Sequence, residues 1–223
     1  MGQNKTSEVS VPFVGCKSDG QAGPVDAPKR SGTKSVKVSS TDAPKLEYFS
    51  AGGDGVLGPR GWFCFDVYGS SGDTLLLAPE PLDAASVFAS DSASMGPAIT
   101  ISHTWGEGSG RPKVAEVIAR IFPTYKSYAT AVTEEFGLTF SFGPFPKDQL
   151  TYERQNVVKF RTPPQTEGLG TNWWLKKNDS QIEGVAILDH GTFNLRLLSV
   201  RLPANLAALA PVIIGQVDRT PFE

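Results

Sequence analysis

The chain has 223 residues, enough for one large domain or two small ones with a substantial hydrophobic core. Hydrophobic residues make up 39% of it and charged residues 20%, which excludes an intrinsically disordered or fibrous protein. The formal net charge of −2 argues against a general nucleic-acid binder, whose phosphate contacts require a basic surface, and no apolar run approaches the roughly 18 residues of a membrane-spanning helix.

Residues 1–45 differ in composition from the rest of the chain. They carry seven Lys or Arg against four Asp or Glu, and they contain few large apolar residues. We therefore expect residues 1–10 to be disordered and residues 11–45 to form an irregular N-terminal arm. A single domain is predicted over residues 46–223.

The only two cysteines are Cys16 and Cys64. Two cysteines cannot make a zinc site without both histidines, and no C-x-x-C spacing exists. We favour a disulfide that ties the N-terminal segment to a strand; the alternative is two buried free thiols. A disulfide implies an oxidising compartment and hence a secreted or periplasmic protein. The N-terminal residues carry no signal peptide, so a cytoplasmic protein is the alternative.

Four strands are predicted in the first half of the domain, over residues 46–49, 62–68, 74–78 and 98–105. The second and the fourth alternate apolar and polar residues, which is typical of a strand with one face in a core. A Gly-Ser-Ser-Gly-Asp turn at residues 69–73 joins the second strand to the third, so these two are expected to form a hairpin.

Two amphipathic helices follow, over residues 114–122 and 125–136. Apolar residues recur in both at the three- and four-residue spacing of one helix face. Pro123 separates the two helices, and Gly137 provides a C-terminal cap for the second.

The last third of the chain returns to strands and ends in a helix. A strand is predicted over residues 156–162 and a long hairpin over residues 185–189 and 193–202. A helix then runs over residues 203–217, kinked or restarted at Pro211. This order of elements predicts an α+β fold in which helices flank an antiparallel sheet.

The same order resembles the photosystem II extrinsic protein PsbP and its fold family, an α/β/α sandwich around an antiparallel sheet. The resemblance rests on Pro-Arg-Gly-Trp at residues 59–62 before an early strand, on the helix at 114–122, and on the late hairpin that runs into a terminal helix at 185–217. It covers roughly residues 46–218. It implies a binding or assembly module, although a fold alone does not assign a function.

Three further segments are similar to uncharacterised exported bacterial proteins. These are Val-Pro-Phe-Val-Gly-Cys at residues 11–16, Tyr-Gly-Ser-Ser-Gly at residues 68–72 and Thr-Glu-Gly-Leu-Gly-Thr at residues 166–171. This similarity implies export but no activity.

No cofactor or metal ion is predicted. Residues 53–58 match G-x-G-x-x-G by spacing, but a turn and a strand follow them, whereas a dinucleotide site needs a helix there. The acidic residues show no metal-ligand spacing.

A serine hydrolase is the alternative function. His103 shares a strand face with apolar residues, so it could be a buried structural residue or a general base. With Asp66 and either Ser70 or Ser71 it would complete a Ser-His-Asp arrangement. The Gly-Ser-Ser-Gly turn differs, however, from the G-x-S-x-G elbow of hydrolases and is common in hairpins.

Residues 161–177 form the most promising functional segment, a long loop of Pro, Gly and small polar residues that ends in two adjacent tryptophans. Because neighbours along an extended chain point to opposite sides, at least one of these rings should be exposed. The alternative is that both rings cap the sheet core. The predicted ligand-binding residues are Arg161, Glu167, Asn172, Trp173, Trp174 and Lys176. The leading hypothesis is a non-enzymatic binding or accessory module of an exported protein that recognises a glycan, a peptide or a protein partner.

Overall fold

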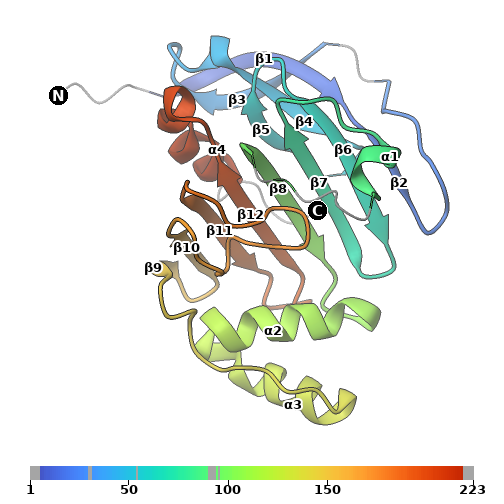
Figure 1. Ribbon diagram of the computed structural model, residues 1–223, viewed down its shortest axis with the longest axis vertical. Coiled ribbons are helices and arrows are strands. Elements are labelled where there is room, and N and C mark those ends of the chain that lie inside the picture. The colour runs from blue at the N-terminus through green and yellow to red at the C-terminus, as the bar shows by residue number, and fades with distance from the viewer. Residues whose placement is uncertain (1–5, 30–31, 54, 90–93, 95, 218–223) are drawn as a thin grey trace.

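The computed structural model describes residues 6–29, 32–53, 55–89, 94 and 96–217. This part of the chain contains two β-sheets and four α-helices (Figure 1). The predicted α+β class, with helices flanking a sheet, is therefore confirmed. No helix within these ranges is long and apolar enough to cross a membrane.

The larger sheet has eight strands in the order β2-β6-β7-β8-β12-β11-β10-β9. Their bounds are β2 (Lys17–Gly20), β6 (Phe63–Gly69), β7 (Gly72–Ala78), β8 (Ala98–Thr104), β12 (Leu195–Arg201), β11 (Ile182–Leu188), β10 (Val157–Thr162) and β9 (Gln149–Arg154). All neighbouring pairs are antiparallel except β2 and β6, which run parallel. The predicted hairpins β6–β7 and β11–β12 are both present. The edge strand β9 was not predicted, because most of its residues are exposed and polar.

The smaller sheet contains the strands β3-β1-β4-β5. They are β1 (Ser7–Gly15), β3 (Thr33–Val38), β4 (Leu46–Ser50) and β5 (Val56–Pro59). The expectation of an irregular arm over residues 11–45, with disorder up to residue 10, was therefore wrong for residues 7–20 and 33–38. The alternating valines of these strands enter the core, since Val11, Val36 and Val38 are almost completely buried.

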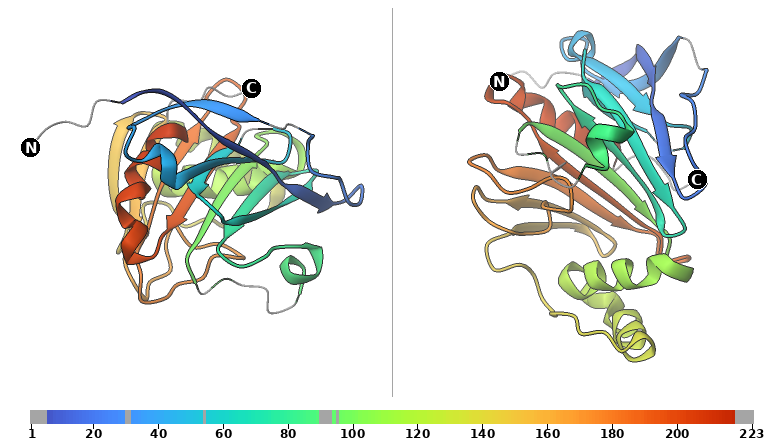
Figure 2. Two further views of the ribbon diagram at one scale, coloured as in Figure 1. Left: turned by 90° about the horizontal axis from the view of Figure 1, so that it is seen from above. Right: turned by 45° about the vertical axis from the view of Figure 1, so that its right-hand side comes forward.

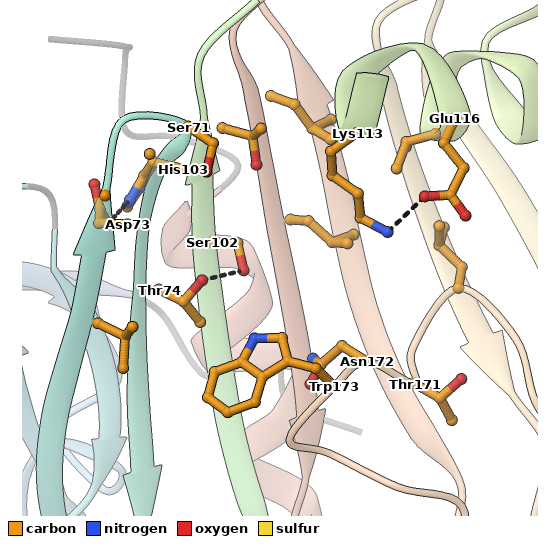
Figure 3. A pocket seen from close by; sticks show the side chains of 18 of the residues that line it. Ser71, Asp73, Thr74, Ser102, His103, Lys113, Glu116, Thr171, Asn172 and Trp173 are labelled. Carbon is orange, nitrogen blue, oxygen red and sulfur yellow. Dashed lines mark hydrogen bonds and ion pairs between the residues drawn. The ribbon is translucent and has the colours of Figure 1, made fainter. Parts of the chain in front are cut away.

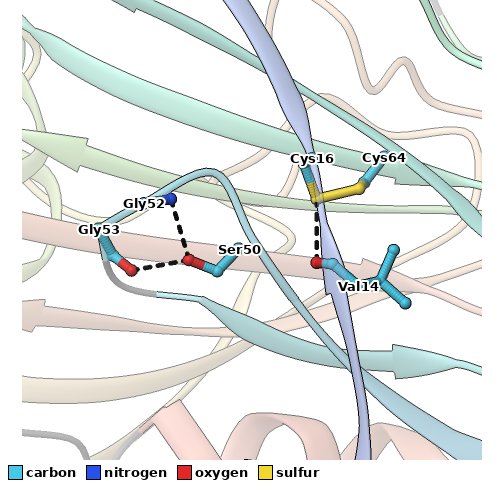
Figure 4. The surroundings of a disulfide bond; sticks show 6 residues. All are labelled: Val14, Cys16, Ser50, Gly52, Gly53 and Cys64. Carbon is cyan, nitrogen blue, oxygen red and sulfur yellow. Dashed lines mark hydrogen bonds between the residues drawn. A yellow bond between two sulfur atoms is a disulfide. The ribbon is translucent and has the colours of Figure 1, made fainter. Parts of the chain in front are cut away.

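The predicted disulfide between Cys16 and Cys64 is present (Figure 4). It joins the short link between β1 and β2 to strand β6, which pairs in parallel with β2. The N-terminal segment is thus attached to the large sheet by a covalent bond as well as by backbone hydrogen bonds. Free thiols are excluded for both cysteines.

One face of the large sheet is covered by the small sheet and by α4 (Ala210–Val217), as the two turned views show (Figure 2). Side chains that alternate along β7, β8 and β12 supply this core from the large sheet, among them Leu75, Ile101 and Leu198. Helix α4 contributes Ile213 and Ile214.

The other face carries two separate apolar clusters. At one end, α2 (Arg111–Ile121) and α3 (Lys126–Phe136) pack on β10, β11 and β12. Both match the predicted helices, and α3 ends at Gly137, whose φ of 63° is the left-handed conformation that glycine adopts without strain. The second cluster lies beneath residues 174–175 and α1 (Ala84–Val87). The surface between the two clusters is left uncovered by helices.

Candidate functional site

A groove of about 680 Å³ lies between these two clusters on the open face of the large sheet. Helix α2 forms one wall and residues 167–173 form the other. Figure 3 shows Lys113 and Glu116 on the helix side and Trp173 across the floor from them. A volume of this size is typical of sites for small organic ligands.

The floor of the groove is one row of side chains that crosses four adjacent strands. In register these are Val67 on β6, Thr74 on β7, Ser102 on β8 and Leu197 on β12. The hydroxyl groups of Thr74 and Ser102 are hydrogen-bonded to each other at 3.0 Å (Figure 3). The floor thus presents two hydroxyls between two apolar side chains. Such a row arises from the register of four strands, so the sequence alone did not reveal it.

The two tryptophans of the loop have opposite environments. Trp173 is 48% exposed and lines the groove, whereas Trp174 is 3% exposed and lies in the second apolar cluster. Asn172 fixes this arrangement: its side-chain oxygen accepts hydrogen bonds from the backbone N–H groups of Trp174 and Leu175, and its side-chain amide donates to Thr100 on β8. The prediction that at least one indole is exposed is confirmed.

The other predicted ligand-binding residues divide between the groove and its surroundings. Glu167 lies on the groove wall and forms an ion pair with Lys177. Lys176 contributes its backbone, which donates to the carbonyl of Ser94. Arg161 is remote from the groove, because it pairs with Glu183 on the neighbouring strand and borders a different depression near α4.

A buried arginine holds the loop in place. Arg201 on β12 is 1% exposed and donates hydrogen bonds to the backbone carbonyls of Ser94, Gly96 and Lys176. Burial lowers the pKa of its guanidinium. Since Lys176 follows the tryptophan pair closely, the arginine fixes the end of the loop that presents Trp173.

The variant Arg201→Met should therefore lose about 3 kcal/mol of unfolding free energy, because three carbonyls lose a charged donor. Urea denaturation measures this, and protease cleavage within residues 161–177 should accelerate in parallel. Arg161→Met is the matched control, since its ion pair is exposed and should contribute less than about 1 kcal/mol. Equal losses in the two variants would contradict the assigned anchoring role.

The histidine considered for catalysis is bonded to a different acid from the one expected. His103 Nδ1 and Asp73 Oδ1 form a hydrogen bond of 2.8 Å, because these residues lie directly opposite each other on β8 and β7. His103 is 8% exposed and its Nε2 atom is shielded from solvent. The ring borders the groove, but one of its nitrogens is bonded to Asp73 and the other is buried, which suits a structural residue better than a base that must reach a substrate.

The two candidate serines lie at the exposed tip of the β6–β7 hairpin. Ser70 Oγ accepts a hydrogen bond from Ser109 and lies near the side chain of Gln21. Ser71 borders the groove, and its carbonyl accepts a hydrogen bond from the Trp105 backbone. These contacts are those of a hairpin turn held against its neighbours.

Asp66, the acid expected to accompany His103, faces a separate cavity. This cavity of about 270 Å³ lies between the large sheet and the N-terminal segment, and its walls include Ser18, Tyr68 and Asp73. Asp66 is 7% exposed, and burial followed by the nearby charge of Asp73 raises its pKa to about 7. Within the described ranges no group of His, Cys, Asp and Glu side chains is arranged to hold a metal ion.

Comparisons of the chain with protein-family models, with curated proteins and with solved structures gave no match.

Proposed function

We propose that this chain is a non-enzymatic binding module of an exported protein and that its groove binds a short oligosaccharide. The observation that carries the proposal is the half-exposed indole of Trp173 beside the hydroxyl groups of the groove floor. A sugar ring has an apolar C–H face that packs on an aromatic ring and a rim of hydroxyls that need hydrogen-bonding partners. The groove supplies both.

The loop that carries Trp173 is hydrogen-bonded to the sheet that forms the groove floor. Asn172 ties the loop to Thr100 of the sheet, so the indole is held at a fixed height above the floor. A preorganised aromatic surface loses little conformational entropy on binding. Rigid support of this kind favours a built ligand site over a chance exposure of one indole.

A peptide ligand is less well supported. Extended peptides usually bind by adding a strand to an exposed sheet edge, where main-chain hydrogen bonds are available. The groove lies instead on a sheet face, and its floor strands β7, β8 and β12 are paired on both sides.

The disulfide supports export. Disulfides persist in secreted and periplasmic proteins and are rare in reducing compartments. This bond joins the N-terminal segment to the large sheet, so a reducing environment would weaken the attachment of the whole small sheet.

The variant Trp173→Ala should lose at least tenfold in affinity for oligosaccharides that the parent protein binds, while its free energy of unfolding changes by less than about 0.5 kcal/mol. A printed glycan array identifies the bound oligosaccharides, and calorimetric titration measures their affinities. The matched control is Trp174→Leu, which should lose about 2 kcal/mol of stability because that indole is buried. A parent protein that binds no glycan, or a Trp173→Ala variant that binds as well as the parent, would overturn the proposal.

A serine-directed fluorophosphonate probe tests the hydrolase alternative. We expect no labelling of Ser70 or Ser71, because neither nitrogen of His103 is placed to activate them. Nδ1 is hydrogen-bonded to Asp73, and Nε2 is buried. Stoichiometric labelling of either serine would overturn the binding-module proposal in favour of a serine hydrolase.

A further inference from the structure

The charged side chains of α2 that face the groove follow one stripe of the helix. They are Lys113, Glu116 and Arg120, at positions i, i+3 and i+7, and Val117 lies among them. The three charged side chains lie on the polar side of the helix, whereas Val117 beside them packs in the apolar cluster. From the sequence alone, such residues are expected to form an ordinary solvent-exposed helix face.

Four of the charged groups that border the groove already have a bonded partner. Lys113 and Glu116 form an ion pair of 2.8 Å, and Glu167 pairs with Lys177 at 3.4 Å. The fourth is Asp73, which is hydrogen-bonded to His103 on the far side of the groove from Glu116 (Figure 3).

Arg120 differs from these groups. Its guanidinium carbon lies 4.3 Å from the ring centre of Phe145, and its Nη1 donates to the carbonyl of Gly143 at 3.4 Å. Across the described ranges, no carboxylate pairs with it. The groove therefore carries one positive charge that the surrounding side chains leave uncompensated.

The position of this guanidinium is fixed before any ligand arrives. Phe145 covers one flat face of the group, and the loop that carries the phenyl ring is held because the N–H of Gly143 donates to the carbonyl of Ala119. Among the described residues, Nε and Nη2 have no acceptor, and the edge formed by these two N–H groups matches the two oxygens of a carboxylate.

On these grounds we propose that the oligosaccharide bound in the groove is acidic and that a uronic-acid carboxylate binds to Arg120. This inference rests on the proposed function and adds the chemical class of the ligand. The sugar ring packs on Trp173, and its carboxylate extends toward the helix wall. Lys113 and Glu116, already paired, border the same wall.

The test uses a glycan array on which uronic-acid oligosaccharides and their neutral parents are printed together. The strongest acidic ligand and its methyl ester are then titrated into the parent protein by calorimetry. We expect the acid to bind at least tenfold more tightly than the ester, and this advantage to shrink as the salt concentration rises.

Arg120→Met should lower the affinity for the acid to that for the ester, because methionine keeps the apolar stem over Phe145 and removes the charge that distinguishes the two ligands. Lys126→Met is the matched control: its ammonium also lies over a phenyl ring, 5.0 Å from the centre of Phe142, but outside the groove. The control should keep the preference of the parent protein.

The outcomes separate the two proposals. Equal affinity for acid and ester, or an Arg120→Met variant that still prefers the acid, would overturn this inference while the glycan module stands. Binding of neither class of glycan would overturn both. Loss of the preference in Arg120→Met, with the preference kept in Lys126→Met, would support it.

Discussion

Replacing both cysteines with alanine should lower the free energy of unfolding by about 4 kcal/mol. The bond between Cys16 and Cys64 spans 48 residues of chain. In the chain-entropy description, a cross-link of this span removes many conformations from the unfolded state and so stabilises the folded one. Alanine is preferred to serine because Cys16 is 1% exposed, and a buried hydroxyl would add a cost of its own.

The loss should affect the whole molecule rather than the N-terminal segment alone. Strand β1 contributes Val11 to the same core as Leu46 and Phe49 of β4, and it pairs with β4 over three residues. Separation of the segment would expose this core. We therefore expect one cooperative transition at lower denaturant concentration, rather than an early transition of the segment followed by a late one.

Urea denaturation followed by tryptophan fluorescence measures the change. The parent protein unfolded with and without a reducing agent provides an independent comparison that involves no substitution. It covers the case in which the double variant does not fold. Unfolding curves that coincide in the presence and absence of reductant would contradict the prediction.

The elements that could be predicted from sequence are those whose apolar pattern and terminating residues all lie within one short segment. Helix α3 has its own apolar stripe and a glycine at the position where the chain turns left-handed. The β6–β7 hairpin has an alternating strand before a tight turn and an apolar strand after it, and Gly72 in the turn has a φ of 135° that favours glycine. These signals depend on residues within one turn or one hairpin of each other, so no distant contact was needed to interpret them.

The strands of the N-terminal segment could not be recognised with the same rules, although their alternation was present. Val36 and Val38 alternate with polar residues on β3, and their partners Val9 and Ser7 lie more than 25 residues away on β1. The parallel pairing of β1 with β4 joins segments still farther apart. Basic and glycine-rich surroundings obscured these short strands, and pairing over such separations leaves no local pattern.

The groove shows the same limit for function. The loop at residues 161–177 and the exposed indole were predictable because composition marked them. The hydroxyl pair of Thr74 and Ser102 depends on the register of β7 and β8, and the same register brings Asp73 rather than Asp66 to His103. A shift of one residue in that register would move every side chain to the opposite face of the sheet. Sequence alone therefore could not show which aspartate pairs with His103.

Asp66 provides the second prediction of large effect, through the pH dependence of stability. Its carboxyl lies in the small cavity under the N-terminal segment, with Tyr68 on its own strand, Asp73 on β7 and His103 on β8 as titratable neighbours. Burial disfavours the charged form most strongly and Asp73 adds repulsion, whereas His103 opposes the shift. Together they raise the pKa of Asp66 from 3.8 to about 7.

The direction of the effect follows from proton binding. Between about pH 4 and pH 7 the folded protein keeps the proton of Asp66, while the unfolded chain has released it. The contribution of this residue to the free energy of unfolding therefore falls as pH rises through this range and levels off above about pH 7. A shift of this size corresponds to about 4 kcal/mol across the whole window.

The variant Asp66→Asn should remove this dependence, because a neutral amide replaces a carboxyl that folding would otherwise have to bury as an anion. Urea denaturation at pH 4 and pH 8 should give similar stabilities at the acidic value and a variant up to about 4 kcal/mol more stable at the alkaline one. Asp189→Asn is the control of opposite sign: Thr192 and Gly191 donate hydrogen bonds to that exposed carboxylate and lower its pKa, so its loss should destabilise the protein at pH 8. An Asp66→Asn variant no more stable than the parent at pH 8 would show that the buried carboxyl is not held in its protonated form.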